Sequence, residues 1–363
     1  MEAYITALCR EMELVSHSAP SRIPVHTVFF GGGTPTLMPE REVEKAFNSI
    51  RQCFDLNSDA EITLEANPGT VSLDYLKFLR SLGANRLSFG MQSADEHELS
   101  LLTRQHGLGD VIQAVEWART AGFDNLNLDL IFGLPGQALK TWKNTLETAL
   151  ELGPDHLSLY ALTIEKGTPM QRWVTRGLMQ EPDDDAAADM YEWSSQRLEQ
   201  AGWRQYEISN WALRGADGQS RVCRHNLQYW LNRPYLGFGA GAHGYAGGVR
   251  TADVPGIQTY IDRIQRGSSL IFPSSPANIS SHQIEREEEM AEMMMVGLRL
   301  TELGVSNASF VARFGTTLDQ NYSKRIRMLM NSGLLEWVGG DEQRLRLTPK
   351  GRLLGNRVFR EFV

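Results

Sequence analysis

Residues 31–35, Gly-Gly-Gly-Thr-Pro, follow a short apolar run and leave the backbone almost bare of side chains. Such a backbone can approach a ligand closely and donate N–H groups to a carboxylate or a phosphate. The stretch matches neither common nucleotide-loop pattern. GxGxxG needs a glycine where Thr36 stands, and GxxxxGK needs a lysine that is missing here. The stretch predicts a loop that contacts a ligand, with a plain turn as the alternative.

Two carboxylates stand in strand-like runs. Glu65 closes an alternating run, where it could accept hydrogen bonds from a substrate ammonium group or form an ordinary salt bridge. Asp129 lies inside the apolar stretch 127–132, where an unpaired buried charge costs too much to be incidental. A functional role, such as a partner for a ribose hydroxyl, and a structural pair are both open for Asp129.

Two histidines, His225 and His243, flank a glycine- and aromatic-rich stretch, with Cys223 close by. These residue types can ligate zinc or an axial haem position. The spacing is a weak metal pattern, and histidines packed in a core are the alternative that it favours.

The elements that would carry these residues alternate along the chain. Short apolar runs occur at 25–30, 61–66, 86–89, 126–132, 156–162 and 205–209. Stretches with helical spacing lie between most of them, at 40–54, 73–82, 111–121, 139–152 and 186–201. Strand–helix–strand repetition predicts a parallel sheet. Gly, Pro and polar residues follow most of the runs, so the ligand-binding edge is expected where the strands end.

The rhythm breaks after residue 210, which divides the chain into four predicted parts. They are a barrel at 1–210, a glycine- and aromatic-rich extension at 211–267, a Ser/Pro-rich linker at 268–283 and a C-terminal module at 284–363. The last part shows two helices and a small hairpin, as in a winged helix. Its basic residues Lys324, Arg325 and Arg327 alternate with apolar ones, which favours a solvated face over a DNA-reading face.

Composition excludes several classes of protein. The hydrophobic fraction of 42% excludes a disordered or fibrous chain, and the net charge of -8 argues against bulk nucleic-acid binding. Apolar runs fall well short of the roughly 18 residues that span a bilayer, and no secretory signal is evident, so we expect a soluble, cytoplasmic protein. The three cysteines form no CxxC pair, so neither a disulfide framework nor a local metal site is expected.

Five motifs, in order and spacing, resemble one family. They are GGGTP at 31–35, LEANP at 64–68, GMQS at 90–93, DLIFGLPG at 129–136 and HNxxYW at 225–230. The chain resembles the radical S-adenosylmethionine (SAM) proteins related to oxygen-independent coproporphyrinogen III oxidase, and within them the HemW haem-chaperone branch. The resemblance covers nearly the whole chain and implies an α/β fold. That fold is a partial (β/α)6 TIM-like barrel, here without its first strand, followed by a winged-helix-like α+β module.

The resemblance also implies a site. SAM and a 4Fe–4S cluster would lie at the strand carboxyl ends. Haem would be bound and passed to an acceptor protein, for which a membrane-associated protein is one candidate. No nucleic-acid partner is expected, and the oligomeric state stays open. The implied SAM residues are Gly32, Gly33, Thr34, Glu65, Gln92, Arg104, Asp129 and Ala161, and His225 and His243 are candidate haem ligands.

The sequence departs from the family in one respect. The CxxxCxxC loop that holds the cluster through three thiolates is absent, so no metal ligands are expected in this chain. Either the cysteines lie upstream of Met1 in a longer polypeptide, which we expect, or the protein lacks a cluster. Whether the chain is an enzyme therefore stays open. The alternative function is an oxygen-independent coproporphyrinogen III oxidase activity in porphyrin biosynthesis.

Overall fold

The computed structural model describes residues 1–215, 217–267, 271–340 and 342–363. The chain forms two compact units. The first unit comprises Met1–Val28, Met38–Glu61 and Arg224–Val363, and the second comprises Phe29–Leu37 and Ile62–Cys223. These units differ from the four parts expected from the sequence, because the first unit takes two N-terminal segments out of the expected barrel. We describe each unit by itself.

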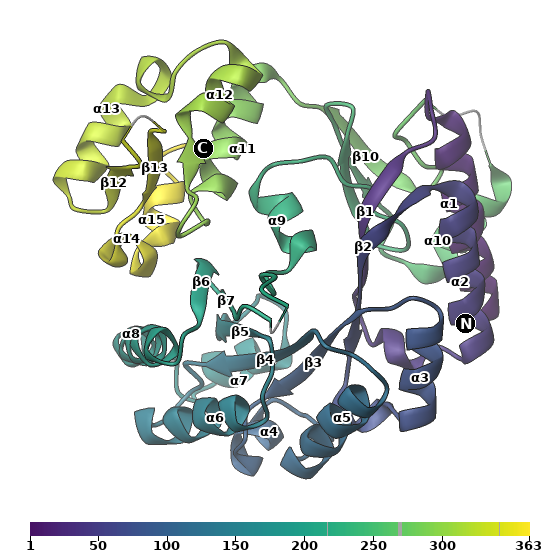
Figure 1. The fold of residues 1–363 in the computed structure, drawn as a ribbon, viewed down its shortest axis with the longest axis horizontal. Coiled ribbons are helices and arrows are strands. Elements are labelled where there is room, and N and C mark those ends of the chain that lie inside the picture. Colours follow the sequence, from purple (N-terminus) through teal and green to yellow (C-terminus); the bar gives the residue numbers. More distant parts are fainter. Residues whose placement is uncertain (216, 268–270, 341) are drawn as a thin grey trace. The chain divides into compact units, whose positions relative to one another are not determined.

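The largest sheet has seven strands in the order β1-β2-β3-β4-β5-β7-β6. These strands are β1 (Pro24–Phe30), β2 (Asp55–Ala66), β3 (Arg86–Gln92), β4 (Leu126–Phe132), β5 (His156–Ala161), β6 (Arg204–Glu207) and β7 (Asn210–Ala212). Strands β2 to β5 pair in parallel. Figure 1 shows them in a curled, partial-barrel sheet. The predicted α/β class with a parallel sheet is therefore confirmed.

The sixth predicted run, 205–209, overlaps strand β6, which does not pair directly with β5. Strand β6 and the short strand β7 form an antiparallel hairpin, and β7 pairs antiparallel with β5. The connection between β6 and β7 has only two residues, whereas a parallel pairing needs a crossover of a dozen or more. Because β7 is antiparallel to both of its neighbours, β6 runs in the same direction as β5, and the predicted sixth strand is present. The short strand β7 that lies between them was not recognised in the sequence.

Helices connect the parallel strands as the sequence predicted. In the second unit they are α3 (Leu73–Ser81), α4 (Glu96–Leu101), α5 (Leu108–Thr120), α6 (Leu139–Glu151), α7 (Pro169–Thr175) and α8 (Asp184–Gln200), with 3₁₀ turns η1 (Pro35–Leu37) and η2 (Pro68–Thr70). Figure 1 shows α3, α5 and α6 along the outer side of the curled sheet. The face that these helices cover is fully apolar, with Leu64, Leu87, Leu128 and Leu157 at 0% exposure. No helix among the described residues is long and apolar enough to cross a membrane.

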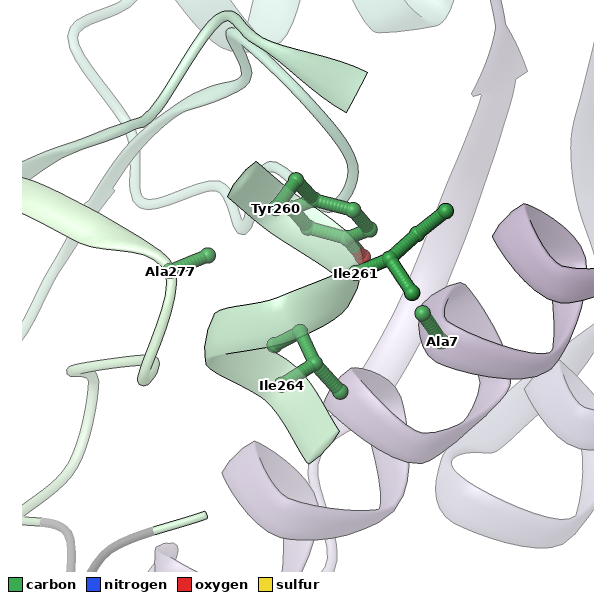
Figure 2. Close-up of a cluster of buried hydrophobic side chains, with 5 residues drawn as sticks. All are labelled: Ala7, Tyr260, Ile261, Ile264 and Ala277. Carbon is green, nitrogen blue, oxygen red and sulfur yellow. The ribbon is translucent and has the colours of Figure 1, made fainter. Parts of the chain in front are cut away.

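The first unit contains the remaining helices. They are α1 (Glu2–Ser18), α2 (Glu40–Cys53), α9 (Arg224–Trp230), α10 (Ile257–Arg266), α11 (Arg286–Gly297), α12 (Asn307–Phe314), α13 (Leu318–Asn331), α14 (Pro349–Leu353) and α15 (Gly355–Phe359). Helices α1 and α10 pack through a cluster of Ala7, Tyr260, Ile261, Ile264 and Ala277, which Figure 2 shows. Burial of these side chains holds together segments that are about 250 residues apart in sequence.

Two small antiparallel sheets complete the first unit. One has the order β10-β9-β8, with β8 (His243–Ala246), β9 (Val249–Asp253) and β10 (Asn278–Gln283). The other has the order β11-β13-β12, with β11 (Val305–Ser306), β12 (Leu335–Val338) and β13 (Arg344–Leu347). Helices α12 and α13 with this second sheet give the winged-helix-like arrangement that the sequence predicted.

The predicted linker at 268–283 ends in strand β10, which pairs with β9 along Val249–Asp253. Its residues 268–270 lie outside the described part of the chain. The Ser-rich composition hid the strand because its side chains are mostly exposed, so no apolar alternation marks it.

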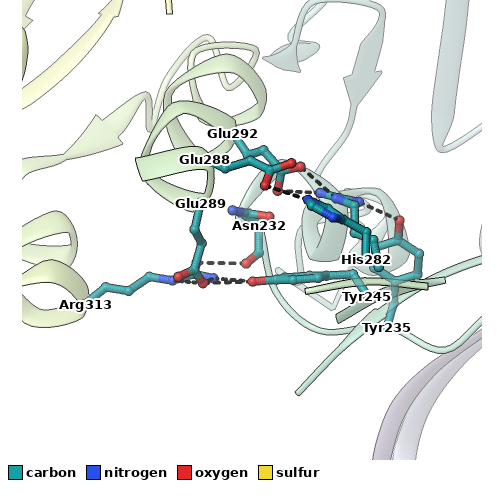
Figure 3. Close-up of polar contacts among 9 residues, drawn as sticks. Asn232, Tyr235, Tyr245, His282, Glu288, Glu289, Glu292 and Arg313 are labelled. Carbon is teal, nitrogen blue, oxygen red and sulfur yellow. Dashed lines mark hydrogen bonds and ion pairs between the residues drawn. The ribbon is translucent and has the colours of Figure 1, made fainter. Parts of the chain in front are cut away.

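An ion-pair network joins the sheet β8–β10 to α11 and α12, as Figure 3 shows. Arg250 forms a two-bond pair with Glu292, at 2.7 and 2.6 Å. Glu289 pairs with Arg313 and accepts a 2.8 Å hydrogen bond from the Tyr245 hydroxyl. These contacts connect the sheet β8–β10 to helices α11 and α12 within the first unit.

Candidate functional site

The glycine loop after β1 exposes its backbone. Gly32 and Gly33 adopt positive φ angles of 88° and 68°, in the region that favours glycine. Apart from their chain neighbours, no atom lies within 4 Å of the place where a Cβ of either residue would stand. The loop therefore borders open space, with Thr34 partly exposed beside it.

Glu65 holds this loop. Its Oε2 accepts a 3.0 Å hydrogen bond from the backbone N–H of Gly32. At Gly31 a Cβ would lie 2.5 Å from the Phe29 ring and 3.3 Å from the Glu65 carboxyl carbon, so only glycine fits there. The loop and the end of strand β2 thus form one edge in the second unit.

Asp129 brings a second carboxylate to the same site. Burial raises the pKa of Glu65, the Gly32 N–H opposes this, and the charge of Asp129 raises it further. Burial also raises the pKa of Asp129, against hydrogen bonds from Asn127, Ser158 and Ser88. Two partly exposed carboxylates that influence each other suit a cationic ligand, because a positive charge would relieve both.

Gln92 ends strand β3 in a strained conformation. Its φ is 66°, and it is one of three residues other than glycine with positive φ among those that the structure describes. Its amide folds back so closely over Gly90 that a Cβ there would lie 2.8 Å from Nε2. Strain of this kind is commonly kept where a side chain must be aimed at a ligand.

The remaining predicted SAM residues lie in the second unit without a direct contact to this group. Arg104 is exposed and follows α4, and Ala161 is exposed at the end of β5, paired with Phe132 of β4. The structure therefore joins Gly32, Glu65 and Asp129 through contact or charge. It places Gln92 and Ala161 at strand ends and Arg104 in the segment that follows β3 and α4.

The candidate haem ligands lie in the first unit. Both ring nitrogens of His225 are engaged: Nδ1 is 3.0 Å from the Thr27 hydroxyl and Nε2 is 2.9 Å from the Tyr229 hydroxyl. His243 is exposed at the start of β8. Two rings of the aromatic-rich stretch pack together: the ring centroids of Tyr229 and Tyr235 lie 4.6 Å apart, and the rings are nearly perpendicular.

The described residues contain no group of three His, Cys, Asp or Glu side chains that could hold a metal ion. Cys9 and Cys53 lie in the first unit, whereas Cys223 lies in the second. The donor set of these residues therefore does not fit a 4Fe–4S cluster, and we derive no step through one. By contrast, the open glycine backbone and the two carboxylates fit the ammonium, carboxylate and ribose groups of SAM.

Sequence reasoning missed a set of polar residues beside Asp129. Ser88, Asn127, His156 and Ser158 are all buried, at 6%, 1%, 0% and 3% exposure. They occupy alternate positions of strands that were interpreted only as apolar runs. Period-two alternation was the available signal, since it places them together on one face of the sheet.

Comparison with known proteins agrees with this geometry. Residues 12–149 match the radical SAM superfamily, and residues 284–354 match the HemN C-terminal domain. The haem chaperone HemW of Bacillus subtilis is 39% identical over 100% of this chain and 92% of its own length. HemW of Escherichia coli is 38% identical over 81% of this chain and 74% of its own length.

A solved structure shows the same fold. Coproporphyrinogen III oxidase (HemN) from Escherichia coli, a radical SAM enzyme, superposes with a TM-score of 0.81 at 23% identity, covering 99% of this chain and 82% of the oxidase. The full-length similarity to HemW shows that the chain belongs to the HemW haem-chaperone family of radical SAM proteins.

Proposed function

We propose that this protein is a haem chaperone that binds haem, passes it to an acceptor protein and binds SAM in its second unit. The observation that carries the SAM site is the meeting of the open Gly32–Gly33 backbone with the carboxylates of Glu65 and Asp129. The haem function is supported by relatives, named haem chaperones, that align along the full chain. A cytoplasmic location stays a prediction of the sequence.

Each site residue has a part in holding SAM. The backbone at Gly32, Gly33 and Thr34 would contact the methionine moiety, with Glu65 accepting hydrogen bonds from its ammonium group. Asp129 would accept hydrogen bonds from the ribose, Gln92 and Arg104 would line the remaining pocket, and Ala161 would contact the adenine. When bound, SAM supplies an adenosylated sulfonium, whose positive charge favours the ionised forms of Glu65 and Asp129.

The haem ligand is one of two imidazoles. His243 is exposed and available to iron, whereas His225 would have to exchange its hydrogen bond with Tyr229 for a bond to the metal. We therefore expect His243→Ala to change the haem spectrum more than His225→Ala. An unchanged Soret band in both variants would exclude both histidines as ligands.

One experiment tests both bindings together. The wild-type chain and Asp129→Asn are titrated with haem by absorbance and with SAM by calorimetry. We expect Asp129→Asn to weaken SAM binding about tenfold or more, as for a lost hydrogen bond to a charged group, while haem binding stays the same. Equal SAM affinity would disprove the pocket assignment, and an absence of haem binding in the wild type would disprove the chaperone function.

A further inference from the structure

A row of polar side chains crosses the second unit's sheet just before the SAM site. The register pairs Glu65 with Ser88, Ser88 with Asn127, and Asn127 with His156, so the row spans strands β2 to β5. Residues directly opposite each other point to the same face. Asp129 stands two residues beyond Asn127 and therefore shares this face, one step closer to the strand ends.

Hydrogen bonds along this row all run in one direction. Asn127 Nδ2 donates to Asp129 Oδ1 at 2.8 Å and to Ser88 Oγ at 2.6 Å. Ser88 Oγ in turn donates to Asp129 Oδ2 at 3.0 Å. Both oxygens of the Asp129 carboxylate are therefore held by donors from this row.

His156 and Ser158 both contact the oxygen of the Asn127 amide, and the Ser158 hydroxyl donates to it at 3.2 Å. The Nδ1 of His156 lies 2.6 Å from Asn127 Oδ1, and its Nε2 lies 2.8 Å from the Tyr206 hydroxyl. Because Asn127 presents its oxygen, Nδ1 must carry the proton and Nε2 must accept from Tyr206. Burial lowers the pKa of His156 well below its ordinary value, so the ring is neutral and has one N–H to give.

We propose that Asn127, His156 and Tyr206 are positioning residues for Asp129, whose carboxylate they aim at a bound ligand through a one-way chain of hydrogen bonds. None of the three needs to touch the ligand. The proposal rests on the SAM site proposed above, and it assigns to the buried row a role in affinity as well as in stability.

A turned amide shows why direction matters. If Asn127 were reversed, its oxygen would face the Asp129 carboxylate and its NH₂ would face the Nδ1–H of His156, so both contacts would be repulsive. The Ser158 hydroxyl and a proton on His156 Nδ1 both disfavour this reversal, and in that tautomer the Tyr206 hydroxyl donates to Nε2. The chain of hydrogen bonds thus links the Tyr206 hydroxyl, on β6, to the orientation of the Asp129 carboxylate.

Four variants test the chain with S-adenosylhomocysteine as the probe in calorimetry. Asn127→Leu removes the donor to Asp129, and His156→Leu removes the group that orients Asn127. His156→Asn is the conservative variant, because its amide can replace the Nδ1–H donor, and Tyr206→Phe removes a single hydroxyl. Asp129→Asn is the reference for loss of the carboxylate itself.

We expect Asn127→Leu and His156→Leu to weaken binding about tenfold, His156→Asn to recover most of that loss, and Tyr206→Phe to cost about threefold. The effect should vanish with the 2′,3′-dideoxy analogue of the probe, which lacks the ribose hydroxyls. Affinity should fall as pH is lowered through the pKa of Asp129, which burial raises against hydrogen bonds from Asn127, Ser158 and Ser88 and the charge of Arg86. In Asn127→Leu that midpoint should rise, because one of these donors is lost. A purely structural role would weaken binding of the probe and of its dideoxy analogue alike.

The outcomes separate the two proposals. If Asp129→Asn binds the probe as the wild type does, the SAM pocket itself is wrong. If Asp129→Asn weakens binding but Asn127→Leu and Tyr206→Phe do not, the positioning chain is wrong and the pocket stands. Nitrogen NMR of His156 gives an independent check, and a proton on Nε2 would overturn the chain even if His156→Leu failed to fold.

Discussion

Each unit contains a network of hydrogen bonds around carboxylates. The network in the first unit stabilises the fold, whereas the network in the second unit leaves carboxylate surface open to a ligand. In the first unit Glu11 accepts hydrogen bonds from the Tyr260 hydroxyl at 2.7 Å, from the Gly239 N–H at 2.9 Å and from the Ser275 hydroxyl. Beside it, Asp253 is held by the Asn278 amide at 2.6 Å. In the second unit Asp129 is also held by donors, but it stays partly exposed at the edge where Glu65 and the glycine loop meet.

The difference lies in what remains for a ligand. Glu11 and Asp253 are 0% and 3% exposed, and their donors come from α10, from β10 and from the loops that contain Gly239 and Ser275. That network is closed, so its energy goes into holding α1 against those segments. Asp129 and Glu65 keep part of their surface open, so a ligand can complete their hydrogen bonding. A buried carboxylate is therefore informative about function only when its network is open.

The largest effect is expected in the closed network. Glu11→Gln replaces one carboxylate oxygen by an NH₂ group, so at least one of the three donors loses its acceptor and the charge that strengthens the other hydrogen bonds is removed. We expect the free energy of unfolding to fall by about 3 kcal/mol, measured by urea denaturation. SAM affinity of the folded variant should stay as in the wild type.

Glu13→Gln is the matched control on the same helix, because the Glu13 side chain is 44% exposed. It should change stability by less than about 0.5 kcal/mol. Equal effects of the two substitutions would show that the closed network does not stabilise this unit.

In the open network, a substitution should lower SAM affinity and leave the free energy of unfolding nearly unchanged. Glu65→Gln removes a carboxylate whose pKa is raised chiefly by burial, so the folded protein should be equally stable or slightly more stable. SAM affinity should fall about tenfold or more, since an amide offers the ammonium group a weaker partner, which corresponds to about 1.5 kcal/mol or more.

Calorimetry and thermal unfolding of the same Glu65→Gln sample measure the two quantities, with the exposed Glu96→Gln as control. A large loss of stability without loss of affinity would place Glu65 in the closed class instead.

The pH dependence of the free energy of unfolding distinguishes the closed network from the open one without a ligand, and this effect is smaller. Burial and the neighbouring Glu11 raise the pKa of Asp253 to about 8, from 3.8 in the unfolded chain. Between these values the folded state holds a proton that the unfolded state has released, so stability falls as pH rises from about 4 to about 8. One proton corresponds to about 1.4 kcal/mol per pH unit within that window.

Urea denaturation of the wild type and of Asp253→Asn at pH 6 and pH 7 measures this slope. The variant should lose it, and parallel pH dependences in the two proteins would contradict the assignment.

Much of the second unit could be predicted from local patterns. Strands β1 to β5 and their helices follow from hydrophobic periodicity, and the glycine loop, Glu65 and Asp129 stand out because their residue types conflict with a plain core strand. Strands β7 and β10 could not be found in this way. One depends on a two-residue connection, and the other is an exposed strand with no apolar face.

Period-two alternation could have placed the polar residues behind Asp129 on one face of their strands, but their pairing across strands was out of reach. Ser88, Asn127 and His156 belong to three different strands, and no local pattern says which residues will lie opposite each other. Register is set by the packing of whole strands, so neighbours across a sheet appear only once the fold is known. For the same reason the closed network around Glu11 joins residues more than 200 positions apart.

The register of β3 and β4 has a consequence for how this protein reaches its native state. If β4 paired one residue out of step, Asn127 and Asp129 would turn toward the helix-covered side, and Leu128 would turn toward the polar side. Such a misfolded intermediate would bury two polar groups without partners, so the chain should reject it early. Asn127 and Asp129, which belong to the proposed ligand site, thereby also disfavour a misaligned pairing of β3 and β4 during folding.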